Sequence, residues 1–100
     1  MKRGNAIGMI EIFGLAYILQ AADAMGKAAD VEIVGYENVA SGYISVLAEG
    51  DVSACRSAVE AGVKAVEAMG GSVYSSAVIA SPHPSLAKIT KRYTFDNLLR

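Results

Sequence analysis

Apolar and polar residues alternate along this chain with a period that changes several times, and each change marks the boundary of a predicted element. Residues 6–13 are mostly apolar and end at Gly14, which predicts a buried strand. The period then becomes helical, which predicts a helix ending near Ala29. We expect one buried stripe on this helix, formed by Leu15, Ile18, Leu19, Ala22 and Met25.

The middle of the chain reads as two strands joined by a short turn. From Val31 onward apolar and polar residues alternate, which is typical of a strand. The turn Asn38-Val39-Ala40-Ser41-Gly42 follows, in which Gly42 permits positive φ. Residues 43–48 form a second apolar run. These two strands are expected to pair antiparallel.

A second helix and a last strand complete the pattern. Asp51 is expected to be the N-cap of the helix, with its carboxylate accepting hydrogen bonds from free backbone N–H groups. Gly70 and Gly71 are expected to end it, because glycine tolerates positive φ. Residues 73–80 read as the last strand. The buried stripe of this helix is expected to comprise Val52, Cys55, Val59, Gly62, Val63 and Val66.

The predicted order is strand, helix, strand, strand, helix, strand. That order predicts an α+β fold, an antiparallel sheet with two helices on one face and the ferredoxin-like βαββαβ arrangement. Residues 1–84 form the predicted domain. Residues 85–100 form a C-terminal extension, a short helix or a flexible tail, in which apolar residues alternate with lysines and arginines.

Composition narrows the possible functions. With 53% hydrophobic and 19% charged residues in 100, part of the apolar surface is expected to face other subunits. A net charge of −1 argues against nucleic-acid binding. We find neither a signal peptide nor about 18 consecutive apolar residues, so a cytosolic protein without a membrane partner is expected. Cys55 is the single cysteine and is interpreted as a buried apolar residue.

Catalytic and metal-binding patterns are weak. His83 is the single histidine and has no carboxylate at ligand spacing, so neither a metal nor a cofactor is expected. Ser41 lacks a nearby general base and the context of an activated nucleophile. We find no pair of carboxylates that suggests acid/base chemistry. The sequence therefore favours a protein that is not an enzyme.

Five motifs together carry a resemblance to a known family. In order they are Gly8-Met9-Ile10-Glu11, Ala21-Ala22-Asp23-Ala24-Met25, the turn at 38–42, Glu49-Gly50-Asp51-Val52 and Pro82-His83. In order and spacing, from about residue 6 to residue 83, the chain resembles the single-domain, hexamer-forming BMC shell proteins of bacterial microcompartments. The resemblance implies a location in a microcompartment shell in the bacterial cytoplasm.

The resemblance implies a pore. In that family the turn lies at the axis of a homohexamer, which would make Ala40, Ser41 and Gly42 the pore rim and Asn38 a near-pore residue. Many relatives have lysine at the position of Asn38, so this pore is expected to attract anions less strongly. Backbone N–H groups and the Ser41 hydroxyl would favour small polar metabolites over apolar gases.

The resemblance also implies an edge that meets neighbouring hexamers and other shell proteins. Lys27 matches the edge lysine of the family, and Asp23 lies one helical turn before it in a favourable i, i+4 pair. Ser81 precedes the Pro82-His83 pair where the family commonly has arginine. A weaker contact between hexamers is therefore expected, because serine cannot make a bidentate hydrogen bond.

Two other functions fit the same order of elements. A small-molecule-sensing regulatory domain is built on ferredoxin-like units, although we find no long effector loop here. A small hydrolase of the acylphosphatase type would need an arginine cradle in the first loop, which here reads Phe13-Gly14-Leu15. We rank the hydrolase last.

Overall fold

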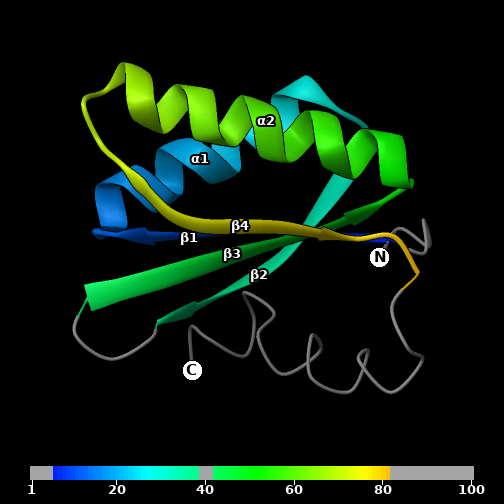
Figure 1. Ribbon diagram of the computed structural model, residues 1–100, viewed down its shortest axis with the longest axis horizontal. Coiled ribbons are helices and arrows are strands. Elements are labelled where there is room, and N and C mark those ends of the chain that lie inside the picture. Colours follow the sequence, from blue (N-terminus) through cyan, green and yellow to red (C-terminus); the bar gives the residue numbers. More distant parts are fainter. Residues whose placement is uncertain (1–5, 39–41, 82–100) are drawn as a thin grey trace.

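A computed structural model of the chain describes residues 6–38 and 42–81. The elements match the predicted order (Figure 1). They are β1 (Ala6–Phe13), α1 (Leu15–Ala28), β2 (Val31–Asn38), β3 (Tyr43–Gly50), α2 (Val52–Ala68) and β4 (Val73–Ile79). Boundaries differ from the predicted ones by one or two residues, at the ends of α1, β3 and β4.

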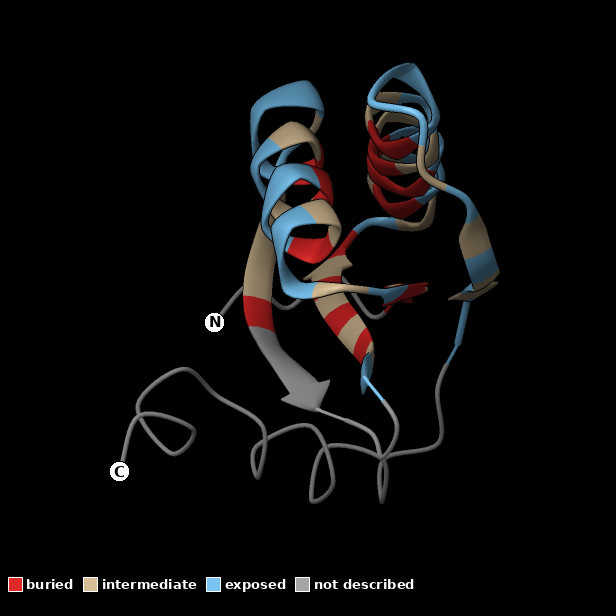
Figure 2. Ribbon diagram, turned by 90° about the vertical axis from the view of Figure 1, so that its left-hand side faces the viewer, coloured by how far each residue is buried: buried red, intermediate tan, exposed pale blue. Residues whose placement is uncertain are grey.

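The strands form one antiparallel sheet in the order β2-β3-β1-β4. Both helices lie on the same face of this sheet, as Figures 1 and 2 show from two directions. The molecule therefore has two layers, and the predicted α+β fold with ferredoxin-like order is confirmed. Strands β2 and β4 are the two edges of the sheet.

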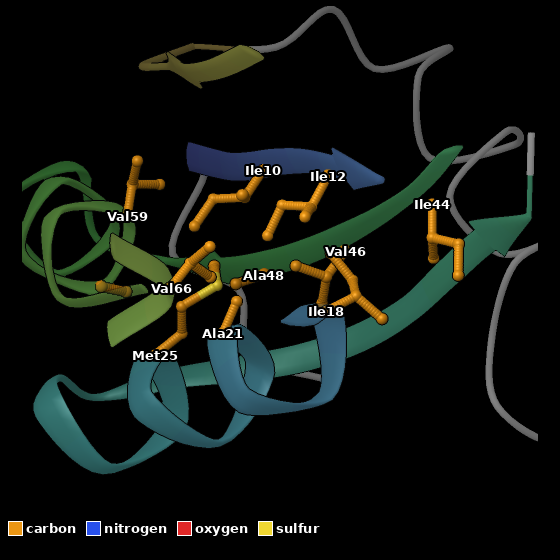
Figure 3. Close-up of a cluster of buried hydrophobic side chains, with 11 residues drawn as sticks. Ile10, Ile12, Ile18, Ala21, Met25, Ile44, Val46, Ala48, Val59 and Val66 are labelled. Carbon is orange, nitrogen blue, oxygen red and sulfur yellow. The ribbon is translucent and has the colours of Figure 1, made fainter. Parts of the chain in front are cut away.

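The hydrophobic core fills the space between the helices and the sheet (Figure 3). From the sheet come Ile10 and Ile12 of β1 and Val46 of β3, and from the helices Met25 and Val66, all fully buried. Burying each large aliphatic side chain contributes roughly 1.5–3 kcal/mol. Alternate residues of β1 and β3 face this core, so the remaining ones face the other side of the sheet.

Helix α2 approaches β1 closely at Gly62. A Cβ atom at this position would lie 2.5 Å from Ile10 Cδ1 and 2.9 Å from Met25 Cγ. Neither approach is possible without displacing a core side chain. Gly62 is therefore required by the packing of both helices on the sheet.

The buried stripe of α1 differs from the predicted one. Ile18, Ala21 and Met25 are the buried residues of this helix, whereas Leu15 and Leu19 are more than half exposed. Leu15 and Leu19 lie four residues apart and therefore share one edge of the helix. Spacing alone places them beside Ile18, but the sheet meets the helix on the side of Ala21. The prediction was wrong for these two leucines.

The ends of α2 confirm part of the prediction. Asp51 occupies the N-cap position, but its carboxylate makes no capping hydrogen bond, contrary to expectation. Its backbone carbonyl instead accepts a bond from the Cys55 N–H at 2.8 Å, which starts the helix. At the other end Gly70 has φ +89°, and its N–H donates to Glu67 O at 3.0 Å, as a helix-ending glycine does.

Cys55 is fully buried, so its interpretation as a buried apolar residue is confirmed. Its thiol donates a weak hydrogen bond to the Gly50 carbonyl, with a sulfur to oxygen distance of 3.7 Å. Burial raises the pKa of the Cys55 thiol, and the nearby Glu49 carboxylate adds to the rise. The thiol therefore stays protonated and unreactive.

Candidate functional site

The base of the β2–β3 turn is fastened to the turn between β1 and α1. Gly14 N–H donates to Gly42 O at 3.1 Å. Both glycines have positive φ, +110° at Gly14 and +86° at Gly42, a backbone conformation that other residues rarely adopt. The end of the turn that enters β3 is thereby held in one position relative to the sheet.

The ring of Phe13 packs directly on Gly42. A Cβ atom at residue 42 would lie 2.9 Å from Phe13 Cε2, closer than real Cβ atoms approach. Both the short distance to Phe13 and the positive φ of residue 42 therefore require glycine at this position. The sequence prediction that Gly42 uses positive φ is confirmed.

Three aromatic rings on neighbouring strands lie beside this turn. The rings of Phe13 and Tyr43 meet edge to face with centroids 5.4 Å apart, and those of Tyr43 and Tyr74 lie 4.9 Å apart at a tilt of 57°. Phe13 is nevertheless 60% exposed and Tyr74 67% exposed. This cluster was not predicted from the sequence, although the alternation of β1 around Ile10 and Ile12 shows that Phe13 points away from the core.

Exposed apolar side chains gather at the same end of the molecule. Of the large apolar residues that are exposed, Phe13 ends β1, Leu15 and Leu19 lie in the first turns of α1, Met69 follows α2 and Tyr74 begins β4, whereas Ile79 lies apart from them at the other end of β4. In Figure 1 these element ends lie at the same end of the molecule as the β2–β3 turn, with the end of α2 in the helix layer. We call these five residues the apolar end. Exposed apolar side chains gathered in this way are typical of a surface that contacts another molecule.

The predicted pore residues are only partly within the described structure. Gly42 lies directly before β3, and Asn38 is the last residue of β2, where it pairs with Ile44. Ala40 and Ser41 lie outside the described residues. The positions of Asn38 and Gly42 place the predicted pore turn at one end of the sheet, next to the apolar end.

The predicted edge residues that the structure describes lie away from this turn, in the second half of α1 and just after β4. Lys27 Nζ contacts Asp23 Oδ2 at 2.9 Å in the last turns of α1, as the i, i+4 spacing predicted, and both side chains are largely exposed. Ser81 is exposed just after β4. His83 lies outside the described residues. Because exposed ion pairs contribute little stability, the Asp23–Lys27 pair is available for contacts with another molecule.

Two properties of the described residues bear on other functions. No group of three or more histidine, cysteine, aspartate or glutamate side chains within residues 6–38 and 42–81 could hold a metal ion. In the same part of the chain, neither helix has the length and apolar character needed to span a bilayer.

Comparison with known proteins gives one family. The BMC domain model matches residues 6–82. The carboxysome shell protein CcmK1 of Thermosynechococcus vestitus is 47% identical over 91 residues, which cover 89% of this chain and 80% of that protein. The carboxysome shell protein CsoS1 of Prochlorococcus marinus is 46% identical over 80 residues, covering 80% and 78%.

A solved structure agrees with the sequence comparisons. The microcompartment protein from Desulfitobacterium hafniense has a TM-score of 0.75 and 34% identity, covering 84% of this chain. This chain spans 47%, about half, of that protein's length. Sequence family, relatives and fold thus agree with the motifs found along the sequence. The chain belongs to the BMC domain family and is a structural shell protein of a bacterial microcompartment.

Proposed function

We propose that this chain forms cyclic homohexamers that tile into the microcompartment shell and conduct small polar metabolites through a central pore at the β2–β3 turn. The shell role of the similar carboxysome proteins supports a structural function rather than catalysis. It also favours this hypothesis over the regulatory domain and the hydrolase. Neighbouring hexamers and other shell proteins are the proposed partners.

The apolar end is the observation that carries the proposal. Its five exposed side chains belong to elements at the same end of the molecule as the β2–β3 turn, so copies that meet with these ends toward a common axis would bury them together. Each fully buried large apolar side chain contributes roughly 1.5–3 kcal/mol. In a closed ring every copy would bury its apolar end against neighbouring copies, so this stabilisation would arise at every interface.

The pore itself would be neutral and polar. Six turns around an axis would present backbone N–H groups and the hydroxyl of Ser41, which bind polar and anionic solutes. Asn38 adds an amide and no charge at the end of β2. Because Gly14 and Gly42 hold the base of each turn, the pore would keep a fixed width at that level.

Replacing Ser41 with phenylalanine should close the pore and leave the assembly intact. Six rings at the axis would fill a narrow channel, whereas residue 41 is not among the five residues that define the apolar end. Electron microscopy of the rings measures the central hole, and light scattering measures the mass. Ser57→Phe on the exposed side of α2 is the matched control. A Ser41→Phe ring with an open centre would mean that residue 41 lies away from the axis.

Lys27→Ala should abolish sheets or tubes of hexamers without changing the hexamer. Lys27 lies at the end of α1 away from the turn, so its loss removes a contact between hexamers only. Gel filtration gives the size of the hexamer and electron microscopy shows the sheets. Lys64→Ala, which removes another exposed lysine of an i, i+4 pair, is the control. A hexamer that dissociates on Lys27→Ala would place Lys27 inside the ring.

A further inference from the structure

Tyr74 occupies a β-bulge at the start of β4. Glu11 of β1 pairs with Ser75, and Ile12 of β1 pairs with Val73, so Tyr74 is the extra residue of the bulge. Val73 packs against the core on the helix side of the sheet. In a regular strand, Tyr74 and Ser75 would point to opposite faces. The bulge instead turns both of them to the far face of the sheet, meaning the face opposite α1 and α2.

Contacts made by these two residues show that direction. The centroid of the Tyr74 ring lies 4.9 Å from that of Tyr43, which alternates with core residues of β3. The hydroxyl of Ser75 donates to Glu11 Oε1 at 3.2 Å, and Glu11 alternates with core residues of β1. Bulges of this kind often lie next to functional sites, where they re-aim a side chain. Here the bulge brings an aromatic ring and a carboxylate to the same face.

Four side chains on the far face form what we call the aromatic–carboxylate cluster. Its members are Glu11, Phe13, Tyr43 and Tyr74. Phe13 lies two residues after Glu11 on β1, about 7 Å along the strand, and pairs with Tyr43. The side chains of Phe13 and Tyr74 are more than half exposed, and Glu11 is partly exposed. Ring surface and carboxylate are therefore both within reach of a solute.

Glu11 gives this cluster a negative charge. Among residues 6–38 and 42–81, the basic residues are Lys27, Arg56 and Lys64, and all three belong to helices on the other side of the sheet (Figure 2). Two of them, Lys27 and Lys64, pair with carboxylates of their own helices. The hydrogen bond from Ser75 orients the Glu11 carboxylate and leaves its charge in place.

Exposed aromatic rings beside a carboxylate have the chemistry that recognises an organic cation. A ring attracts a cation that lies within about 6 Å of its centroid, and a carboxylate adds Coulomb attraction. The alkyl groups of an organic ammonium ion also bury apolar surface on the rings. We propose that the aromatic–carboxylate cluster binds a small organic ammonium ion, which contacts the exposed rings of Phe13 and Tyr74 and directs its charge toward Glu11.

The binding itself belongs to one chain, but its consequence rests on the proposed hexamer. The cluster lies beside the base of the β2–β3 turn, where Phe13 packs on Gly42. Six clusters would then surround one mouth of the pore, with one side of each ring packed on a neighbouring copy and the other open to solutes. They would concentrate organic cations at this mouth. The N–H donors of the turn would act separately, at the rim itself.

Saturation-transfer NMR of the full chain with tetramethylammonium chloride tests the proposal. We expect saturable binding in the millimolar range, because each solvent-exposed contact between a cation and a ring is weak. tert-Butanol is the neutral probe of similar size and should bind less tightly. Sodium chloride keeps the ionic strength equal in all samples, since screening by salt weakens exposed charge interactions.

Two substitutions separate the charge from the ring. Glu11→Gln keeps an acceptor for Ser75 and removes the charge, whereas Tyr74→Leu keeps an apolar side chain and removes the aromatic face. Each should weaken binding about two- to fivefold, and the two together should abolish measurable saturation. Glu60→Gln, which removes an exposed carboxylate of α2, is the matched control and should leave binding unchanged. Circular dichroism and light scattering check the fold and mass of each variant.

The outcomes distinguish this proposal from the proposed function. Equal binding of tert-butanol and tetramethylammonium would overturn it by showing an apolar surface without selectivity for charge. Unchanged binding by the double variant would also overturn it, because the cation would then lie elsewhere. A hexamer that binds no tetramethylammonium would contradict the cluster alone. Binding by a chain that is not hexameric would support the cluster and contradict its place at a pore.

Discussion

Leu19→Asp should dissociate the hexamer, whereas Gln20→Asp, one residue later, should leave it intact. Leu19 is 55% exposed on the edge of α1 that belongs to the apolar end, so its side chain lies outside the buried core of the monomer. In a hexamer, the substitution would remove a buried leucine, worth roughly 1.5–3 kcal/mol per copy. It would also place six unpaired carboxylates in apolar contacts, which costs more.

Light scattering after gel filtration measures this effect directly, at protein concentrations where the parent chain is a single species. Gln20 is exposed on the same helix, so Gln20→Asp controls for the added charge. Circular dichroism checks that the Leu19→Asp chain keeps its helices and strands. A folded Leu19→Asp chain with unchanged mass would show that the apolar end is not the subunit interface.

Gly62→Val should lower the stability of the fold by about 1–3 kcal/mol, the usual cost of overpacking a filled core. Valine has the higher helix propensity, which offsets only a few tenths of a kcal/mol of this loss. The cost arises because its Cβ would lie 2.5 Å from Ile10 Cδ1 and 2.9 Å from Met25 Cγ. For a chain of this length, a loss of about 2 kcal/mol corresponds to a fall in Tm of roughly 10 °C.

Gly26→Ala is the matched control for this prediction. Gly26 also lies within a helix, but the nearest atom to a Cβ there, Ile33 Cγ1, is 3.9 Å away. Alanine should therefore stabilise the fold by up to about 1 kcal/mol through helix propensity. Urea unfolding of the two variants and the parent chain gives the free energies. Gly62→Val as stable as the parent would contradict the packing of α2 on β1.

The order of elements follows from the sequence because each is marked locally. The change of period at Gly14, the alternation after Val31 and the glycines after Met69 are all short-range signals, and the strands and helices occur where they predict. The Asp23–Lys27 pair was likewise predictable, since i, i+4 spacing alone sets it. Local signals thus account for the fold class and for the ion pair between two of the predicted edge residues.

Features that depend on the packing of two or more elements could not be predicted from such local signals. The direction from which the sheet meets α1 decides that Ala21 is buried and Leu19 is not. The aromatic cluster depends on strand register, which brings Phe13 opposite Tyr43. Asp51 was expected to cap α2 by side-chain chemistry, but the backbone carbonyl begins the helix without it. The Gly62 contact depends on the distance between α2 and β1.

For the candidate site, the position of the turn could be predicted from the sequence, but the contacts that hold its base in place could not. Gly42 was recognised as a residue suited to positive φ, whereas its hydrogen bond from Gly14 and its contact with Phe13 join segments about thirty residues apart. The roles of Asn38, Ala40, Ser41, Ser81 and His83 rest on assembly between chains and remain predictions. A single chain carries no direct signal of the symmetry that would bring its copies together.

The absolute mass of the chain in solution tests the proposed assembly most directly, measured by light scattering after gel filtration. Six chains of 10.4 kDa make about 62 kDa, and a single peak at this mass is the expected result. Such a sample should show six-fold rings in the electron microscope. A monomer or a trimer would contradict the hexamer, and the apolar end would then need another partner.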